Sequence, residues 1–165
     1  MLSIEAWRER GDYAEIGGHR IFYVDTKSAH KETIVLIHGF PTSSWDWVKM
    51  WDALAAGYRL VAMDMLGFGY SDKPDPHEYS IHEQADIVES LIEQLSLDTF
   101  HVLAHDYGDT VAQELLARQN EGTGIGAWTS ICFLNGGLFP ETHQALLIQK
   151  LLLSPLGPLI NELTT

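Results

Sequence analysis

The chain has 165 residues, of which 45% are hydrophobic and 20% are charged, and its formal net charge at pH 7 is −13. This length and composition predict one globular domain with a substantial core, and the acidic excess argues against nucleic acid or an anionic membrane surface as a partner. No run reaches the roughly 18 apolar residues of a membrane span, and residues 1–10 do not resemble a signal peptide.

The single cysteine, Cys132, excludes a disulfide within the chain. That is typical of a protein from a reducing compartment, so we expect a cytoplasmic location. Cys132 lies in an apolar run and is interpreted as a small core residue.

The first part of the chain predicts strands. Residues 13–16 and 20–25 are β-prone runs, and Gly17-Gly18 between them is the signal of a hairpin. Residues 33–37 form a near-continuous apolar run, which is typical of a strand buried on both faces of a parallel sheet. The next residues, 38–44, include Thr and Ser side chains that can cap a helix of about ten residues.

Strands and helices then alternate. Residues 59–63 predict a second buried strand, and a glycine-containing loop follows at 67–74. Ser80 and Glu83 match a capping box, and the apolar residues between Ile81 and Leu95 recur at helical spacing. Further on, the apolar runs 128–134 and 141–153 predict another buried strand and another helix.

This alternation predicts an α/β fold with a mostly parallel sheet flanked by helices. In such sheets ligands bind at the carboxyl ends of the strands. The loops that begin at His38, Asp64, Asp106 and Asn135 all follow predicted strands, so we expect them to meet at this edge.

Residues 100–112 contain the most informative motif. An apolar run ends at Asp106, and the small residues Ala104 and Gly108 lie two places to either side of it. This spacing is typical of the sharp strand-to-helix turn that presents a nucleophile, at a helix N-terminus that favours negative charge. The alternative is a helix-capping aspartate, which leaves the small flanking residues unexplained. We therefore predict Asp106 as a nucleophile.

An aspartate nucleophile indicates a particular chemistry. A carboxylate with the reference pKa of about 3.9 is ionised at neutral pH without help from a base. It can attack an sp³ carbon, which opens an epoxide or displaces a halide and leaves an ester. Water activated by a histidine then hydrolyses that ester. The expected substrate is small and hydrophobic, such as an epoxide or an alkyl halide.

Taken together, these motifs resemble the α/β-hydrolase superfamily. The segment His38-Gly39-Phe40-Pro41, the loop from Asp64 to Ser71 and the turn at Asp106 occur in that family's order. The similarity is greater to the branch with an aspartate nucleophile, the epoxide hydrolases and haloalkane dehalogenases. Within this branch, residues 41–44, 67–74, 105–109 and 135–143 are similar to the mesoderm-specific transcript proteins and their bacterial relatives.

The resemblance implies an oxyanion hole made by the backbone N–H groups of Phe40 and Tyr107. The side chains of these residues are not the Trp and Asn with which typical dehalogenases hold halide, which favours epoxide hydrolysis. The alternatives are a haloalkane or haloacid dehalogenase and an esterase-like member. His38 is interpreted as a loop-organising residue and Asp64 as a structural one. His105, a neighbour of Asp106 on the strand, is expected to point away from it.

The resemblance also implies that residues 1–140 are the N-terminal part of the hydrolase core, with about six strands, and that 141–165 begin a helical cap. In the family the catalytic histidine and acid are carried by strands that follow the cap, so both are expected to be missing here. Some dehalogenases have the acid just after the sixth strand, but Asn135 stands at that position. A further alternative is therefore a non-catalytic truncated fragment or interaction protein, which would associate through an exposed sheet edge.

We predict neither a metal nor a cofactor. The histidines show no metal-ligand spacing along the chain. The segment 67–71 has two glycines but lacks the third glycine and the following helix of a dinucleotide-binding fingerprint. Asp109, where many relatives have glycine, has no explanation from the sequence.

Overall fold

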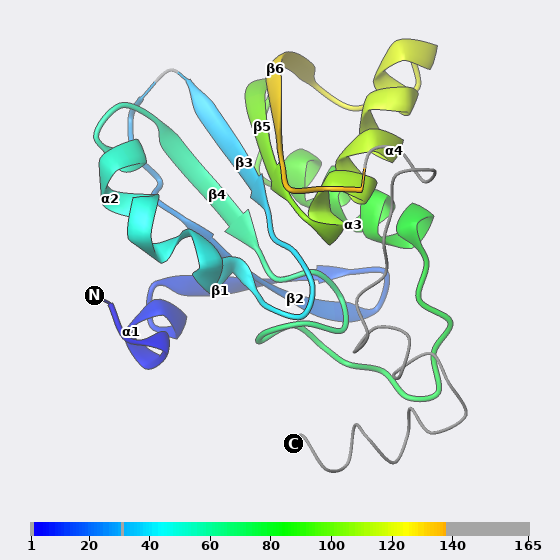
Figure 1. The fold of residues 1–165 in the computed structure, drawn as a ribbon, viewed down its shortest axis with the longest axis horizontal. Coiled ribbons are helices and arrows are strands. Elements are labelled where there is room, and N and C mark those ends of the chain that lie inside the picture. Colours follow the sequence, from blue (N-terminus) through cyan, green and yellow to red (C-terminus); the bar gives the residue numbers. More distant parts are fainter. Residues whose placement is uncertain (1, 31, 138–165) are drawn as a thin grey trace.

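A computed structural model describes residues 2–30 and 32–137, which form one sheet between two layers of helices (Figure 1). In chain order the elements are α1 (Ile4–Arg8), β1 (Gly11–Ile16), β2 (His19–Asp25), β3 (Thr33–Ile37), a 3₁₀ turn (Ser44–Trp47), α2 (Val48–Ala55), β4 (Arg59–Met63), α3 (Ile81–Gln94), β5 (Thr99–His105), α4 (Tyr107–Glu121) and β6 (Ala127–Leu134). The helix predicted over 141–153 and the domain boundary at 140 lie outside the described residues.

The sheet has six strands in the order β1-β2-β4-β3-β5-β6. Neighbours from β4 to β6 are parallel, whereas the β1–β2 hairpin is antiparallel and β2 pairs antiparallel with β4. Gly17 and Gly18 form the hairpin turn with φ angles of 59° and 82°, which glycine adopts without steric cost. The prediction of an α/β fold with a mostly parallel sheet is confirmed.

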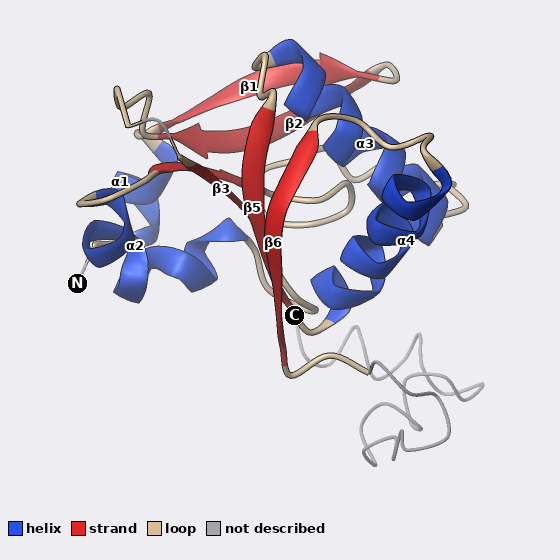
Figure 2. Cartoon of the chain, turned by 90° about the horizontal axis from the view of Figure 1, so that it is seen from above, coloured by secondary structure: helices blue, strands red, loops and turns tan. Residues whose placement is uncertain are grey.

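Helices cover both faces of the sheet. Helices α1 and α2 lie on one face, and α3 and α4 on the other (Figure 2). Every residue of β3 is buried, as expected for a central strand between two helical layers. On the α1–α2 face the core contains Trp7, Trp47 and Trp51, and the rings of Trp7 and Trp51 meet edge to face at 4.7 Å. These tryptophans therefore pack in the core.

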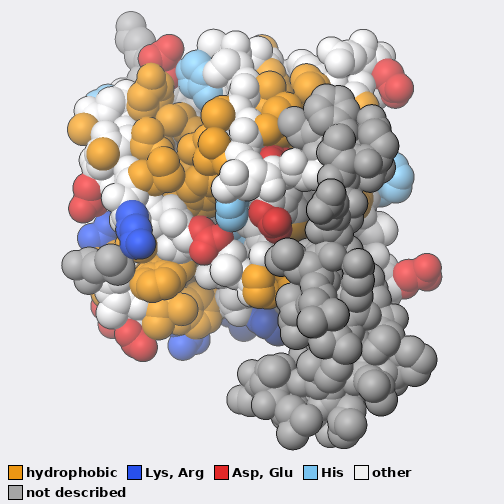
Figure 3. All heavy atoms as spheres, viewed as in Figure 1, with side chains coloured by type: hydrophobic (Ala, Val, Ile, Leu, Met, Phe, Trp, Pro, Cys, Tyr) orange, Lys and Arg blue, Asp and Glu red, His pale blue; other side chains and the backbone are white. Residues whose placement is uncertain are grey.

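Strand β6 differs from the prediction. Its residues were expected to be buried, but none of them is, and Cys132, expected in the core, is exposed. The reason is position: within the described residues β6 is the edge strand and pairs with β5 alone. Part of its surface borders an apolar groove lined by Ile34, Leu54, Tyr58, His101, Val102, Leu103, Ser130 and Cys132. Hydrophobic side chains also gather over α2 and the neighbouring strands (Figure 3).

The helix starts follow local capping chemistry. Ser43 caps the 3₁₀ turn, which continues into α2, so the predicted helix of about ten residues begins with a tighter turn. At α3, the Ser80 hydroxyl accepts a 3.1 Å hydrogen bond from the Glu83 N–H. The Glu83 carboxylate contacts His77 instead of completing the predicted capping box.

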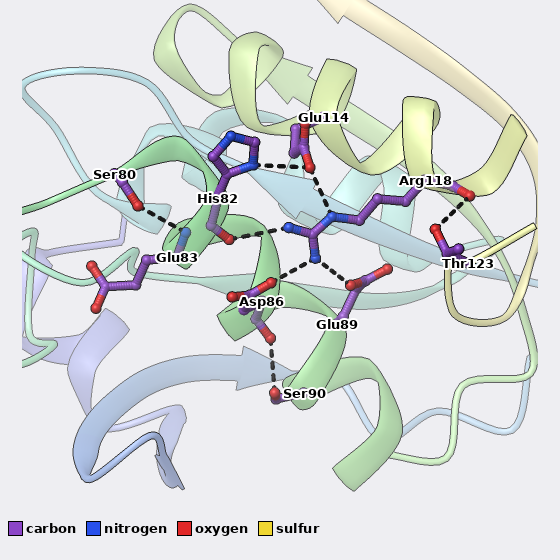
Figure 4. A network of polar contacts seen from close by, with 9 residues as sticks. All are labelled: Ser80, His82, Glu83, Asp86, Glu89, Ser90, Glu114, Arg118 and Thr123. Carbon is purple, nitrogen blue, oxygen red and sulfur yellow. Dashed lines mark hydrogen bonds and ion pairs between the residues drawn. The ribbon is translucent and has the colours of Figure 1, made fainter. Parts of the chain in front are cut away.

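Arg118 joins the two helices on the α3–α4 face (Figure 4). Its Nη1 lies 2.6 Å from Asp86 and 2.7 Å from Glu89, both on α3, and its Nε lies 2.9 Å from Glu114 on α4. Since α4 begins directly after Asp106, this network helps to hold the helix that follows the predicted nucleophile.

Candidate active site

Asp106 occupies a sharp turn between β5 and α4. Its backbone angles, φ 52° and ψ −114°, lie in a region that L-residues rarely adopt, and such a conformation costs on the order of 1–3 kcal/mol. The Asp106 N–H donates a 2.9 Å hydrogen bond to the Leu134 carbonyl at the end of β6. The strained backbone is therefore held in place by an adjacent strand.

Two glycines allow the turn to form. A Cβ on Gly108 would lie 2.5 Å from the carbonyl oxygens of both Ile37 and His38, so only glycine lets α4 approach the end of β3 this closely. A Cβ on Gly39 would lie 2.7 Å from the Cβ of Asp106. Gly108, the small residue predicted two places after Asp106, is therefore needed because backbone atoms lie too close to it for a side chain. Gly39 is needed because Asp106 lies too close to it for a side chain.

The backbone N–H of Phe40 points at the Asp106 side chain and donates a 2.9 Å hydrogen bond to Oδ1. Tyr107 is the first residue of α4, and an N–H in the first turn of a helix has no intrahelical partner. The structure therefore brings Asp106, Phe40 and Tyr107 together at the carboxyl edge of the sheet.

Aromatic rings line this edge. Phe68 packs edge to face against Phe40, with ring centroids 6.2 Å apart, and lies 6.0 Å from the ring of Tyr107. Phe40 is 55% exposed, so the cluster presents apolar surface to solvent. Burial raises the pKa of the Tyr107 phenol, which favours its neutral form. Aromatic side chains thus lie on both segments that flank Asp106, the loop after β3 and the start of α4.

His38 organises the loop that holds Phe40, as predicted. Its ring is fully buried; Nε2 accepts a 3.0 Å hydrogen bond from the Met65 N–H, so Nδ1 carries the proton and donates to the Gly39 carbonyl at 2.7 Å. Burial lowers the pKa of His38, which agrees with this neutral tautomer.

Asp64 is structural, as predicted. The side chain is buried, and its two oxygens accept 2.7 Å hydrogen bonds from the N–H groups of Ser44 and Tyr70. It therefore ties the loop after β4 to the 3₁₀ turn after the His38-Gly39 segment.

Asp109 is a residue whose role the sequence did not explain. Its side chain is fully buried, Oδ1 accepts a 3.3 Å hydrogen bond from the Leu134 N–H, and Oδ2 has no hydrogen-bond partner among the described residues. Burial raises the pKa of its carboxyl group. A Cβ on Gly136 would lie 2.0 Å from Oδ2, so Asp109 fits only because glycine follows β6 there. Asp109 thus links α4 to the end of β6.

His105 packs its ring edge to face against Trp47, at a centroid distance of 6.4 Å. Within the described part of the chain, no histidine forms a hydrogen bond with the Asp106 carboxylate. The sequence missed one cluster: His19, His77 and Glu83 offer ligand atoms that all lie within 4.8 Å of one another. These residues come from separate segments, so no spacing along the chain reveals them.

Comparison with known proteins identifies relatives over most of the chain. The sequence profile of the family described as "alpha/beta hydrolase fold" matches residues 32–133. The mesoderm-specific transcript homolog protein of Bos taurus is 51% identical over 156 residues, which cover 91% of this chain and 47% of that protein. The putative hydrolase LipZ of Mycobacterium tuberculosis is 38% identical over 163 residues, covering 99% of this chain and 56% of LipZ. The chain thus spans about half the length of these curated relatives.

Solved structures agree in fold. The epoxide hydrolase CorEH, without ligand, has a TM-score of 0.67 and 27% sequence identity, over 87% of this chain and 48% of CorEH. A loop variant of the haloalkane dehalogenase DbeA from Bradyrhizobium elkanii has a TM-score of 0.66 and 28% identity, over 74% of this chain and 39% of the dehalogenase. No helix within residues 2–30 and 32–137 is long and apolar enough to cross a membrane.

Proposed function

The chain belongs to the α/β-hydrolase fold family, and we propose that Asp106 is the nucleophile of an epoxide-hydrolase-like reaction on small hydrophobic substrates. The single observation that carries this proposal is the 2.9 Å hydrogen bond from the Phe40 N–H to Oδ1 of Asp106. It combines a carboxylate on a strained strand-to-helix turn with a backbone donor of the kind that stabilises an oxyanion.

In the first step a lone pair of Asp106 Oδ2 forms a bond to an epoxide carbon, while the ring C–O bond breaks and its electron pair stays on the ring oxygen. That oxygen takes a proton from water or an acidic group, which leaves a hydroxyalkyl ester of Asp106. The hydrogen bond from Phe40 holds Oδ1 and leaves Oδ2 available for the attack.

In the second step water attacks the ester carbonyl carbon of Asp106 and gives its proton to a base. Negative charge develops on Oδ1, where the N–H groups of Phe40 and Tyr107 are proposed to stabilise it. The tetrahedral intermediate then expels the alkoxide, which is protonated to the diol and restores the carboxylate. We assign the base to none of the described residues, because none of their histidines is hydrogen-bonded to Asp106.

The apolar rim supports an epoxide as the substrate. Phe40, which bonds Asp106 through its backbone, and Tyr107, the next residue in the chain, form an aromatic cluster with Phe68, and these three side chains provide no indole N–H or amide group to bind a halide ion. A haloalkane dehalogenase, which resembles the chain in fold, would form the same ester from an alkyl halide. Release of halide therefore separates the two reactions.

The test is to incubate the purified chain with styrene oxide and to measure its intact mass, followed by peptide mapping. We expect one stable adduct on Asp106, none in Asp106→Asn, and an unchanged adduct in Asp98→Asn, which alters an exposed aspartate just before β5. A parallel incubation with a bromoalkane should release little bromide. An adduct that persists in Asp106→Asn contradicts the assignment.

A folded chain that forms no adduct would favour the non-catalytic alternative. Two expectations remain predictions: a cytoplasmic location, and self-association through the sheet edge. The second is supported by the exposure of β6, which is the edge strand within the described residues. Size-exclusion chromatography across a range of protein concentrations would test it.

A further inference from the structure

A second cluster of reactive side chains lies in the region where the β1–β2 hairpin meets the start of α3. His19 is the first residue of β2, His77 lies in the loop before α3, and Glu83 is in the first turn of α3. One ligand atom from each residue, an imidazole nitrogen or a carboxylate oxygen, lies within 4.8 Å of the other two, and all three residues are half-buried. Three segments that are separate in the sequence therefore converge.

The side chains already face one another. The His77 Nε2 lies 3.0 Å and 2.9 Å from the two oxygens of Glu83. The His19 and His77 rings meet edge to face with centroids 5.5 Å apart. The His77 ring also contacts Tyr79 at a centroid distance of 4.6 Å, and the Tyr79 hydroxyl donates a hydrogen bond to the Pro74 carbonyl. The orientation of His77 is thus supported by Glu83, His19 and Tyr79.

The Glu83 carboxylate contacts His77 and does not cap the N-terminus of α3. In a complete capping box its carboxylate would accept the N–H of Ser80. Here only half of the box forms, from the Glu83 N–H to the Ser80 hydroxyl, and the carboxylate turns to His77. Figure 4 shows the Glu83 carboxylate directed away from the Arg118 network, whereas the adjacent His82 contacts Glu114.

We propose that His19, His77 and Glu83 form a binding site for one divalent transition-metal ion of the zinc type. Two imidazoles and one carboxylate are a donor set that such ions bind, with a fourth position left to water. Ligand atoms about 2.0–2.1 Å from a tetrahedral ion stand about 3.4 Å apart, so small side-chain rotations convert the cluster into a ligand set. The ion would take the place of the hydrogen bond between His77 and Glu83.

The ion would fasten the hairpin to the loop before α3. Tyr23 of β2 pairs with Met63, the last residue of β4, and His19 precedes Tyr23 in β2, so the cluster lies beyond the carboxyl end of β4. That is the edge of the sheet that carries the Asp106 turn. The site nevertheless shares no residue with the proposed nucleophile and its oxyanion hole, so the two proposals stand independently.

The experiment is isothermal titration of the metal-free full chain with Zn²⁺, and with Mg²⁺ as a hard-ion control that imidazole binds poorly. We expect about one Zn²⁺ per chain and no comparable binding of Mg²⁺. His19→Asn, His77→Gln and Glu83→Gln should each weaken Zn²⁺ binding by more than about ten-fold. Loss of a residue that only hydrogen-bonds to a metal ligand already weakens binding by about ten-fold or more, and these three residues are proposed as the ligands themselves. Glu83→Gln keeps the cap of α3, because that cap uses the backbone N–H.

The matched control is His82→Gln, because His82 is an exposed histidine that also pairs with a glutamate, Glu114. It should leave the affinity for Zn²⁺ unchanged. Far-ultraviolet circular dichroism of each variant establishes that it is folded. The proposal is overturned if the native chain does not bind Zn²⁺, if His77→Gln and Glu83→Gln bind it as the native chain does, or if His82→Gln loses as much affinity as they do.

Discussion

The backbone N–H of Phe40 and the Oδ1 of Asp106 are 2.9 Å apart, although 66 positions separate these residues in the chain. The contact exists because β3 and β5 are parallel neighbours, so the loops that follow them leave the sheet at the same edge. It places a hydrogen-bond donor on the carboxylate that is predicted to react. The geometry of this pair leads directly to the first prediction.

Gly39→Ala should slow the reaction of Asp106 and also destabilise the fold. The new Cβ would lie 2.7 Å from the Cβ of Asp106 and 2.9 Å from His105 Nδ1, so the carboxylate must move. We expect adduct formation with styrene oxide to slow by about one to two orders of magnitude, which is the effect of a misplacement of about 1 Å. The stability loss from overpacking should be about 1–3 kcal/mol.

Mass spectrometry over time gives the rate of adduct formation, and urea denaturation gives the free energy of unfolding. Gly57→Ala is the matched control, because a Cβ at Gly57 meets no atom within 4 Å. It should leave both quantities close to those of the native chain. Equal adduct rates in Gly39→Ala and the native chain would show that Asp106 does not depend on the close approach of this loop.

Asp109 should make the stability of the fold depend on pH. Burial raises the pKa of its carboxyl group above the ordinary value of 3.8, so the folded state holds the proton more tightly than the unfolded state. The contribution of Asp109 to the free energy of unfolding therefore falls as pH rises from about 3.8 through the raised pKa.

Asp109→Asn removes this titration and keeps a side-chain oxygen for the Leu134 N–H. The free energy of unfolding of the native chain, minus that of the variant, should decline as pH rises across this window. Urea denaturation at a series of pH values measures the difference. Asp98→Asn, at an exposed position, should leave the shape of the profile unchanged. A difference that increases with pH would mean that the carboxylate is stabilised in the fold.

Arg118→Gln should loosen the packing of α4 on α3. The guanidinium holds Asp86, Glu89 and Glu114, and the Glu89 side chain is only 12% exposed, so the substitution leaves a largely buried carboxylate without its cation. We expect a loss of about 1.5–3 kcal/mol in the free energy of unfolding, the range for hydrogen bonds to charged groups.

The comparison is Lys27→Gln, which removes a pair with Asp12 whose side chains are 65% and 63% exposed. That loss should be within about 1 kcal/mol, as for other surface ion pairs. A double-mutant cycle of Arg118→Gln with Glu89→Gln isolates the energy of the pair. If Arg118→Gln costs no more than Lys27→Gln, the network does not hold the two helices together.

Local chemistry determined most of the elements. The apolar runs at 33–37 and 59–63 appear as β3 and β4, the glycine pair forms the hairpin turn, and Ser80 caps α3. These features depend on side-chain periodicity and on turn and cap residues, all of which act within a few positions of one another. For the same reason the small residues around Asp106 were enough to predict the strand-to-helix turn.

Only the tertiary structure decided burial and the contacts between distant segments. The apolar residues 128–134 predict a buried strand, but β6 is exposed because it lies at the edge of the described sheet. Asp109 needs Gly136 beside it, and His19 meets His77 and Glu83 only through the order of the strands. A sequence pattern reports what a segment prefers locally, whereas the covered faces and the neighbouring loops are set by the arrangement of the whole sheet.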